Sequence, residues 1–185
     1  AHLVDITHHI PAHDITSAAF TLANSCCHFP DGTVHVAVVD PGVGGERKNI
    51  AVRTDRYFYV GPDNGIFSIV LEKEKVKSIR EIANPPFILN TISQTFHGRD
   101  VFAPCAGRIS GGGRFADIGP ALDDYSRIEY PLTKQSGNTL IGEIMSIDSF
   151  GNLISNISKD MFRDFTHGGP FEIYFSSERF SRIAS

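Results

Sequence analysis

The chain has 185 residues, 41% of them hydrophobic, which is enough for one full domain and part of a second. Its formal net charge is -4, and the 17 basic residues are interspersed among 21 acidic ones, which excludes the basic stripe of a nucleic-acid-binding protein. The longest apolar stretches, such as Val34–Val39, are the length of a strand and far too short to span a bilayer. We therefore expect neither a nucleic-acid nor a membrane partner.

The three cysteines indicate a reducing compartment. Cys26 and Cys27 are adjacent, Cys105 is distant, and no CxxC pair is present, so neither a disulfide framework nor a zinc site is expected. A cytoplasmic location follows. Because the chain opens at Ala1 directly on an apolar segment, without a methionine or a polar lead-in, we expect the natural protein to begin earlier.

Residues 1–115 alternate between strand-like and helix-like patterns, which predicts an α/β domain with a central, mostly parallel sheet. Asp14 is placed to cap a helix from Ile15 to about His28. The continuous apolar run Val34–Val39 is typical of a central parallel strand that is covered on both faces. The other expected elements are strands at His2–Ile6, Ile50–Thr54, Tyr57–Val60 and Val76–Ile82, a helix at Gly65–Glu72, and a helix at Gly98–Ser110 with Val101, Phe102, Cys105 and Ile109 turned inward.

A different pattern follows the α/β segment. Residues 116–138 are polar, contain proline and show no periodicity, so we expect a linker. Residues 139–185 are expected to begin an all-β, barrel-like domain, in which Leu140–Asp148 and Leu153–Ile157 form a hairpin and Phe171–Phe175 adds a strand. This stretch is too short to close a barrel, so the domain is expected to continue beyond it.

Asp40 is the sharpest candidate for a functional residue. It ends the buried run Val34–Val39, and ligands of doubly wound sheets bind beyond the carboxyl ends of strands. Arg47 follows seven residues later, in a glycine-rich loop that is long enough to bring its guanidinium back to the carboxylate. The alternatives remain open, because Asp-Pro-Gly is common turn chemistry and most arginines lie on the surface. The glycines lack phosphate-loop spacing and precede a strand rather than a helix.

A second candidate cluster lies at the start of the helix Gly98–Ser110. His97 and Asp100 are spaced i, i+3, so either residue could cap this helix or take part in chemistry. A metal site would need further ligands, which the His8, His9 and His13 loop could supply, although no metal-binding motif supports it. We therefore expect no metal and no cofactor.

Two further segments offer polar groups but read first as turns. Asn64 lies in Pro62-Asp63-Asn64-Gly65, and Asp148, Phe150 and Asn152 surround a hairpin turn. The second turn would offer a ligand a charge, a stacking face and an amide.

Five ordered motifs together resemble one family. They are Val4–His8 (VDITH), Thr33–Gly44 (TVHVAVVDPGVG), Gly61–Gly65 (GPDNG), Thr95–Asp100 (TFHGRD) and Ile147–Asn152 (IDSFGN). They look like the S-adenosylmethionine hydroxide adenosyltransferases, which are relatives of the fluorinase and chlorinase enzymes. The resemblance implies an α/β domain followed by a β-barrel domain, a homotrimer, and S-adenosylmethionine bound between the N-terminal domain of one subunit and the C-terminal domain of a neighbour.

The resemblance also implies the reaction and its residues. The family's Asp-Arg-His set, which holds the attacking water, falls on Asp40, Arg47 and His97. S-adenosylmethionine would be hydrolysed to adenosine and methionine. The implied substrate-binding residues are Val43, Asn64 and Phe96 in the first domain and Asp148, Phe150 and Asn152 in the second, with Phe96, Phe150 and Asn152 flanking the nucleoside and Asp148 meeting the methionine amine.

The halogenating relatives differ from this chain at the same positions. They carry Tyr in place of Asp40 and Tyr-Ser in place of His97-Gly98, so water rather than halide is the implied nucleophile. The fluorinase loop insertion is also absent between Gly61 and Thr95. The family's opening TDFG-type strand and its C-terminal adenine-binding segment are expected outside this stretch. A metal-dependent hydrolase using His97 and Asp100, and a non-catalytic nucleoside-binding module, remain the alternatives.

Overall fold

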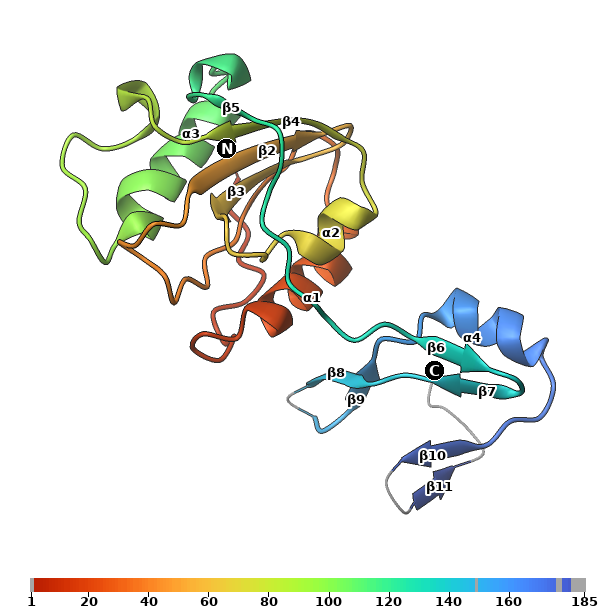
Figure 1. Ribbon diagram of the computed structural model, residues 1–185. Coiled ribbons are helices and arrows are strands. Elements are labelled where there is room, and N and C mark those ends of the chain that lie inside the picture. The colour runs from red at the N-terminus through yellow and green to blue at the C-terminus, as the bar shows by residue number, and fades with distance from the viewer. Residues whose placement is uncertain (1, 149, 176–177, 181–185) are drawn as a thin grey trace. The chain divides into compact units, whose positions relative to one another are not determined.

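The computed structural model describes residues 2–148, 150–175 and 178–180. The chain divides into two compact units, Ala1–Glu129 and Tyr130–Ser185. The first contains a five-stranded sheet with helices, and the second contains β-hairpins and one helix (Figure 1).

The sheet of the first unit is mixed. Its strand order is β1-β3-β2-β4-β5, and only the β1–β3 pair is parallel. The expectation of a mostly parallel sheet is therefore wrong. The turn between β2 and β3 is too short for the crossover that parallel neighbours require, so these strands form an antiparallel hairpin. The bounds are β1 Val34–Val36, β2 Asn49–Thr54, β3 Phe58–Pro62, β4 Val76–Glu81 and β5 Ala121–Leu122.

Strand β1 occupies an edge of the sheet rather than its centre. The ladder covers only Val34–Val36, and the side chains of Val36 and Val38 are about half exposed. The predicted central strand over Val34–Val39 is therefore wrong in position and length. An apolar run predicts burial but does not reveal where a strand lies in the sheet.

Helices cover both faces of this sheet (Figure 1). On one face, α3 (Ala103–Ser110) follows a π-helical turn, η3 (Gly98–Phe102), and packs against Ala51 and Val60. The predicted inward residues of this helix, Val101, Phe102, Cys105 and Ile109, are all buried. On the other face lie α1 (Ile15–Ser25), which continues as η1 (Cys26–His28), and α2 (Ser68–Glu72).

The N-terminal cap of α1 is confirmed. Asp14 accepts a hydrogen bond from the backbone N–H of Ser17 at 2.9 Å and one from its hydroxyl at 2.6 Å. The expected apolar face of this helix is buried at Ala18, Ala19 and Leu22, whereas Ile15 is only partly buried. The cap residue and the apolar spacing together defined this helix from sequence.

Two segments of the first unit differ from expectation. Residues His2–Ile6 form no strand, and Leu3 is 95% exposed, because among the described residues this segment has no neighbouring strand to hydrogen-bond with. Conversely, the aperiodic stretch after residue 115 contributes η4 (Phe115–Asp117) and the edge strand β5, which pairs with β4. Two residues of strand are too few to produce an alternating pattern. The remaining short helix is η2 (Pro85–Phe87).

The described residues of the second unit form three antiparallel hairpins and a helix, α4 (Lys159–Thr166). The hairpins are β6 (Lys134–Ser136) with β7 (Thr139–Ile141), β8 (Ile144–Ile147) with β9 (Leu153–Ser155), and β10 (Ile173–Phe175) with β11 (Glu178–Phe180). The expectation of an all-β domain is wrong, since α4 lies in this unit. The helix begins at Ser158, whose side chain caps it by accepting a hydrogen bond from the N–H of Met161 at 3.2 Å. The predicted hairpin around Asp148 is confirmed for β8 and β9, but the single strand predicted over Leu140–Asp148 is wrong, because its first residues belong to β7, which pairs with β6 instead. Residues 176–177 and 181–185 of the expected barrel lie outside the described residues.

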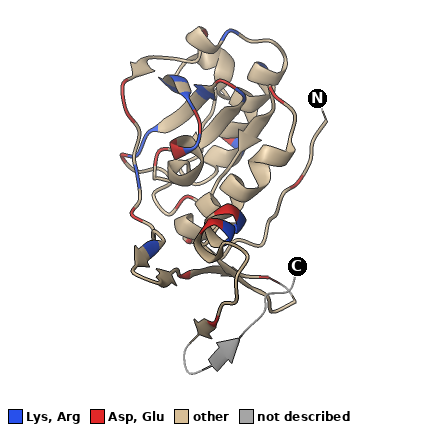
Figure 2. Ribbon diagram, turned by 90° about the vertical axis from the view of Figure 1, so that its right-hand side faces the viewer, with Lys and Arg blue, Asp and Glu red and all other residues tan. Residues whose placement is uncertain are grey.

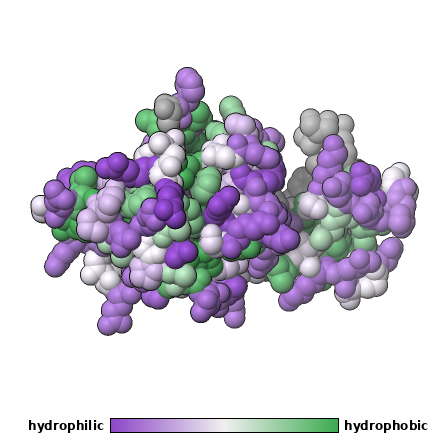
Figure 3. All heavy atoms as spheres, turned by 90° about the horizontal axis from the view of Figure 1, so that it is seen from above, coloured by the Kyte–Doolittle hydropathy of each residue, from purple (hydrophilic) through white to green (hydrophobic). Residues whose placement is uncertain are grey.

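Charges of both signs are mixed along the part of the chain that the structure describes. Figure 2 shows lysines and arginines interspersed with acidic residues, and on the face seen in Figure 3 apolar groups alternate with hydrophilic ones. Within the part of the chain that the structure describes, no helix is long and apolar enough to cross a membrane.

A buried histidine on β1 predicts acid sensitivity of the fold. His35 on β1 is 4% exposed, stacks on Tyr59 at 5.3 Å, and its Nε2 has no hydrogen-bond partner among the described residues. Burial lowers the pKa of His35 from 6.5 to about 4. The unfolded chain therefore binds this proton more readily than the folded one, and stability present above pH 6.5 is lost as the pH falls toward 4, by about 3 kcal/mol in total.

His35→Phe should remove that component. In urea unfolding, the difference in unfolding free energy between this variant and the original chain should change between pH 7 and pH 4.5, in favour of the variant at low pH. His28→Phe, at an exposed histidine, is the control and should show a constant difference. A constant difference for His35→Phe would show that His35 does not report the fold's acid sensitivity.

Candidate active site

The predicted residues Asp40, Arg47 and His97 meet around one guanidinium. Arg47 donates from Nε to Oδ1 of Asp40 at 2.9 Å and from Nη2 to Oδ2 of the same carboxylate. Nη2 also lies 2.9 Å from Nδ1 of His97. The side chains of Arg47 and Asp40 are only 10% and 6% exposed, so this two-pronged ion pair is shielded from water.

The fold explains why these residues converge. Asp40 follows the carboxyl end of β1, and the parallel neighbour β3 ends beside it. Arg47 precedes β2, which runs antiparallel to β3 and begins at the same end of the sheet. His97 immediately precedes η3 and comes from the segment before it. The site therefore lies beyond the carboxyl ends of the two parallel strands, where the sequence places Asp40.

A glycine allows the two loops to approach each other. Gly44 has a φ of +75°, and a Cβ at this position would lie 2.4 Å from the carbonyl oxygen of Gln94. Only glycine fits both the backbone conformation and the space. The Asp40–Arg47 loop consequently packs against the segment that carries His97.

The hydrogen bonds define the protonation of His97. A guanidinium can only donate, so Nδ1 of His97 accepts from Arg47 and the neutral ring carries its hydrogen on Nε2. Burial first, and the charge of Arg47 second, lower the pKa of His97 below 6.5, while Asp40 and Asp100 act in the opposite direction. His97 is therefore neutral at pH 7.

Asn49 is a fourth member that the sequence prediction missed. Its Oδ1 accepts a hydrogen bond from Nη1 of Arg47 and lies 3.3 Å from Nδ1 of His97. The guanidinium of Arg47 also lies 5.7 Å from the ring of Phe102, which covers it from the α3 side. The position of Asn49, two residues after Arg47 at the start of a strand, is the only sequence signal, and it is weak.

Asp100 is turned away from this group. It is 1% exposed, and its carboxylate accepts from the Ser93 N–H at 2.8 Å and from Arg99 Nε at 2.6 Å. These hydrogen bonds lower the pKa of Asp100, and the bond with Arg99 has the largest effect. In the described part of the chain, no three His, Cys, Asp or Glu side chains are close enough together to hold a metal ion. His97 and Asp100 thus do not share a ligand set with His8, His9 and His13.

The other residues predicted for the site in the first unit are Val43, Asn64 and Phe96, and the side chains of Asn64 and Phe96 contact groups outside the cluster. Asn64 donates to the Val39 carbonyl at 2.8 Å and accepts from the Ile66 N–H, so it ties the end of β3 to the segment before Asp40. Val43 is partly buried in the loop. Phe96 is 58% exposed, with the guanidinium of Arg99 at 5.0 Å from its ring.

Asp148, Phe150 and Asn152 belong to the second unit, where they form one turn. Oδ1 of Asp148 accepts from the N–H groups of Phe150 and Asn152, both at 2.8 Å, and Oδ2 accepts from the Asn152 amide at 2.7 Å. These bonds lower the pKa of Asp148, that of the Asn152 side chain most. Phe150 is 90% exposed at the tip of the turn.

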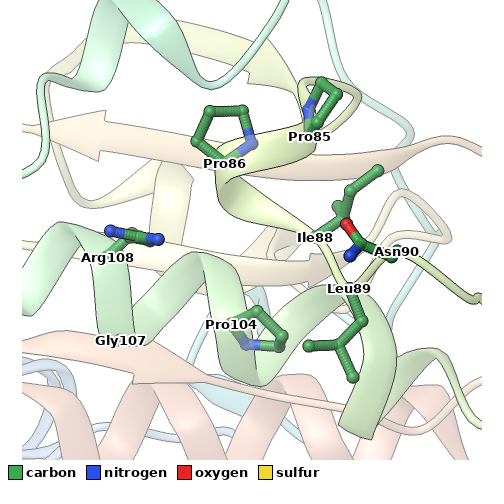
Figure 4. Close-up of a pocket in the computed structure, with 8 residues that line it drawn as sticks. All are labelled: Pro85, Pro86, Ile88, Leu89, Asn90, Pro104, Gly107 and Arg108. Carbon is green, nitrogen blue, oxygen red and sulfur yellow. The ribbon is translucent and has the colours of Figure 1, made fainter.

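A shallow hollow of about 490 Å³ lies elsewhere on the first unit. Figure 4 shows Pro85 and Pro86 of η2 facing Pro104 and Arg108 of α3 across it. None of the four cluster residues lines this hollow, and we therefore do not regard it as the candidate active site.

The first unit is a mixed α/β unit with a shielded Asp-Arg-His group at the carboxyl ends of its two parallel strands, and a β-rich unit follows it. These features define a class of α/β protein with two compact units and a polar cluster at the end of its sheet. The sequence comparisons agree with this class. The N-terminal domain model of the SAM hydroxide adenosyltransferases matches residues 1–119, and the C-terminal domain model matches residues 142–185. The chain belongs to this family, and the resemblance seen in its motifs is confirmed.

Individual relatives fit the same assignment. Proteins named (R)-S-adenosyl-L-methionine hydrolase are 39% identical in Salinispora arenicola, over 83% of this chain and 59% of that protein, and 40% identical in Methanocaldococcus jannaschii, over 86% and 56%. A fluorinase of Actinoplanes sp. is 26% identical over 85% of this chain and 62% of that protein. The chain thus spans less than two thirds of the length of these relatives.

A solved structure shares the fold closely. The crystal structure of an uncharacterized conserved protein from Thermotoga maritima superposes with a TM-score of 0.93 at 33% identity, covering 97% of this chain and 70% of that one.

Proposed function

We propose that the protein hydrolyses S-adenosyl-L-methionine to adenosine and L-methionine. The observation that carries this proposal is the single guanidinium of Arg47, which joins the Asp40 carboxylate to His97 in a shielded corner of the sheet. The choice of substrate follows the relatives of 35–40% identity, which are named for this hydrolysis.

The chemistry requires mainly positioning. Water attacks the ribose 5′-carbon in line with the carbon–sulfur bond; the new C–O bond forms as the C–S bond breaks, and sulfur keeps the electron pair. The departing sulfonium becomes a neutral thioether, so no acid is needed for the leaving group. Fixing the water in line can contribute on the order of 7–11 kcal/mol in the best intramolecular cases.

We assign the proton acceptor to Asp40. Nδ1 of His97 is occupied by Arg47, and its Nε2 carries a hydrogen, so neutral His97 can donate to the water but cannot take its proton at Nε2. Each carboxylate oxygen of Asp40 retains a free lone pair beside the bond to Arg47. Asp40 would accept the proton and release it to solvent, His97 would orient the water oxygen, and Arg47 would hold both.

The remaining substrate contacts are also proposals. Val43, Asn64 and Phe96 would line the first unit's side of the site, and the turn with Asp148, Phe150 and Asn152 would present a carboxylate, an exposed ring and an amide to the amino and nucleoside groups. Following the family resemblance, we propose a homotrimer whose sites combine the N-terminal domain of one subunit with the C-terminal domain of another. A light-scattering mass of one subunit for the full-length protein would contradict this arrangement. The free thiols of Cys26, Cys27 and Cys105 support a cytoplasmic location.

The test is a product assay. Full-length protein incubated with S-adenosylmethionine should release adenosine and methionine in equal amounts, and it should do so with EDTA present. When chloride or fluoride is added, no 5′-halogenated nucleoside should form. Loss of activity in EDTA with recovery on adding zinc would favour a metal-dependent hydrolase. Binding of the substrate without turnover over hours would favour a nucleoside-binding module, and either result would overturn the proposal.

A further inference from the structure

We propose that Asn49 is a positioning residue for this reaction: it fixes the guanidinium of Arg47, and Arg47 in turn holds His97 in its neutral form. The expected effect of Asn49 on turnover rests on the proposed hydrolysis, whereas its expected effect on the titration of His97 does not. Oδ1 of Asn49 accepts from Nη1 of Arg47 and lies 3.3 Å from Nδ1 of His97, so one amide oxygen faces both residues.

The backbone of Asn49 is part of the sheet, whereas that of Asp40 and of Arg47 is not. Asn49 is the first residue of β2, where it pairs with Pro62, and its carbonyl accepts from the Ile82 N–H at 2.8 Å. Asp40 and Arg47, in contrast, lie in the loop that joins β1 to β2. Asn49 therefore connects the guanidinium to the sheet itself and opposes its rotation away from Asp40.

The orientation of the Asn49 amide follows from Arg47. Turning the amide over would place its NH₂ group against Nη1, donor against donor, so Oδ1 must face the guanidinium. With His97 neutral, Oδ1 and Nδ1 are then two acceptors with no hydrogen between them. When His97 is protonated, Nδ1–H can donate to Oδ1 but must give up its bond with Arg47.

An uncharged amide at position 49 is thus the suitable group. A carboxylate there would attract a proton onto Nδ1 of His97. An apolar side chain would remove the Asn49 acceptor and leave Nη1 of Arg47 with the long bond to the Lys48 carbonyl, at 3.5 Å. The charged groups acting on His97 are Arg47, which disfavours the imidazolium, and Asp40 and Asp100, which favour it. Asn49 adds no charge to this balance.

The first experiment follows the His97 ring by NMR titration of ¹⁵N-histidine-labelled full-length protein, without substrate. The original protein should show the Nε2–H tautomer. Asn49→Asp should raise the midpoint of the His97 titration by roughly one pH unit or more, because a carboxylate near Nδ1 stabilises the imidazolium. Asn24→Asp, which adds the same charge at an exposed position of α1, is the control and should leave the midpoint unchanged.

The second experiment measures turnover. Asn49→Leu should lower kcat by roughly tenfold or more through displacement of Arg47, with KM changed by less than about twofold. Asn49→Asp should retain the contact with Arg47 but shift the acid limb of the kcat profile upward by the same amount as the His97 titration. Asn24→Leu is the matched control for the loss of an amide.

The outcomes separate the two proposals. If the His97 titration of Asn49→Asp and the kcat of Asn49→Leu both match those of the Asn24 variants, Asn49 has no positioning role. If the full-length protein does not hydrolyse S-adenosylmethionine but Asn49→Asp still shifts the His97 titration, the proposed function fails while the link between Asn49 and His97 stands. Thermal melts of both variants exclude loss of folding as the cause.

Discussion

Asp40→Asn should lower kcat for S-adenosylmethionine hydrolysis by about 10²–10⁴, the range typical of a lost general base. Asparagine has the same shape but cannot accept the proton of the attacking water. It also presents an NH₂ group where the Arg47 guanidinium expects an acceptor, since both carboxylate oxygens of Asp40 accept from Arg47. The variant should keep its secondary structure by circular dichroism, with the loss seen in kcat rather than in KM.

A matched control exists in the same unit. Asp31 also pairs with an arginine, Arg56, at 2.8 Å, but its side chain is 70% exposed and lies outside the site. Asp31→Asn should leave turnover unchanged. If Asp40→Asn retains more than a third of the original kcat, Asp40 is not the proton acceptor.

Arg47→Met should both inactivate and destabilise the protein. Asp40 is only 6% exposed, so removing its partner leaves a buried carboxylate unpaired. Breaking such a pair costs about 3–5 kcal/mol of unfolding free energy, whereas an exposed pair contributes about 1 kcal/mol or less. Loss of the group that holds Asp40 and His97 together should also reduce turnover by roughly 100-fold.

Urea unfolding and turnover assays on two variants provide the comparison. Arg56→Met removes the exposed partner of Asp31 and should change the unfolding free energy by less than about 1 kcal/mol, with no effect on rate. Equal destabilisation by Arg47→Met and Arg56→Met would show that the Asp40–Arg47 pair is no more buried in solution than a surface pair.

Much of the site was predictable because its parts are local. The seven-residue spacing between Asp40 and Arg47 allowed the ion pair to be proposed from loop length, and the structure contains it. His97 was harder, since a residue before a helix can equally be a cap, and only the motif resemblance joined it to the other two. Its convergence with Arg47 depends on the close approach at Gly44, for which the sequence offers only a glycine.

What could not be predicted depends on neighbours distant in sequence. The apolar run at Val34–Val39 predicts burial but carries no information on strand order, and the strand that it forms lies at the edge of the sheet rather than at its centre. Asn49 has no motif of its own, and its role follows only from the atoms that surround it. In the second unit, α4 begins at the Ser158 cap, and a single serine between strand-like segments is too weak a signal to predict a helix there.

The most direct test of the central claim is the mass of adenosine formed in H₂¹⁸O. If water held by Asp40, Arg47 and His97 attacks the ribose 5′-carbon, adenosine should carry one ¹⁸O, methionine should carry none, and Asp40→Asn should form the labelled product at least about 100-fold more slowly. Unlabelled adenosine, or label in methionine, would mean that water does not attack this carbon and would contradict the account.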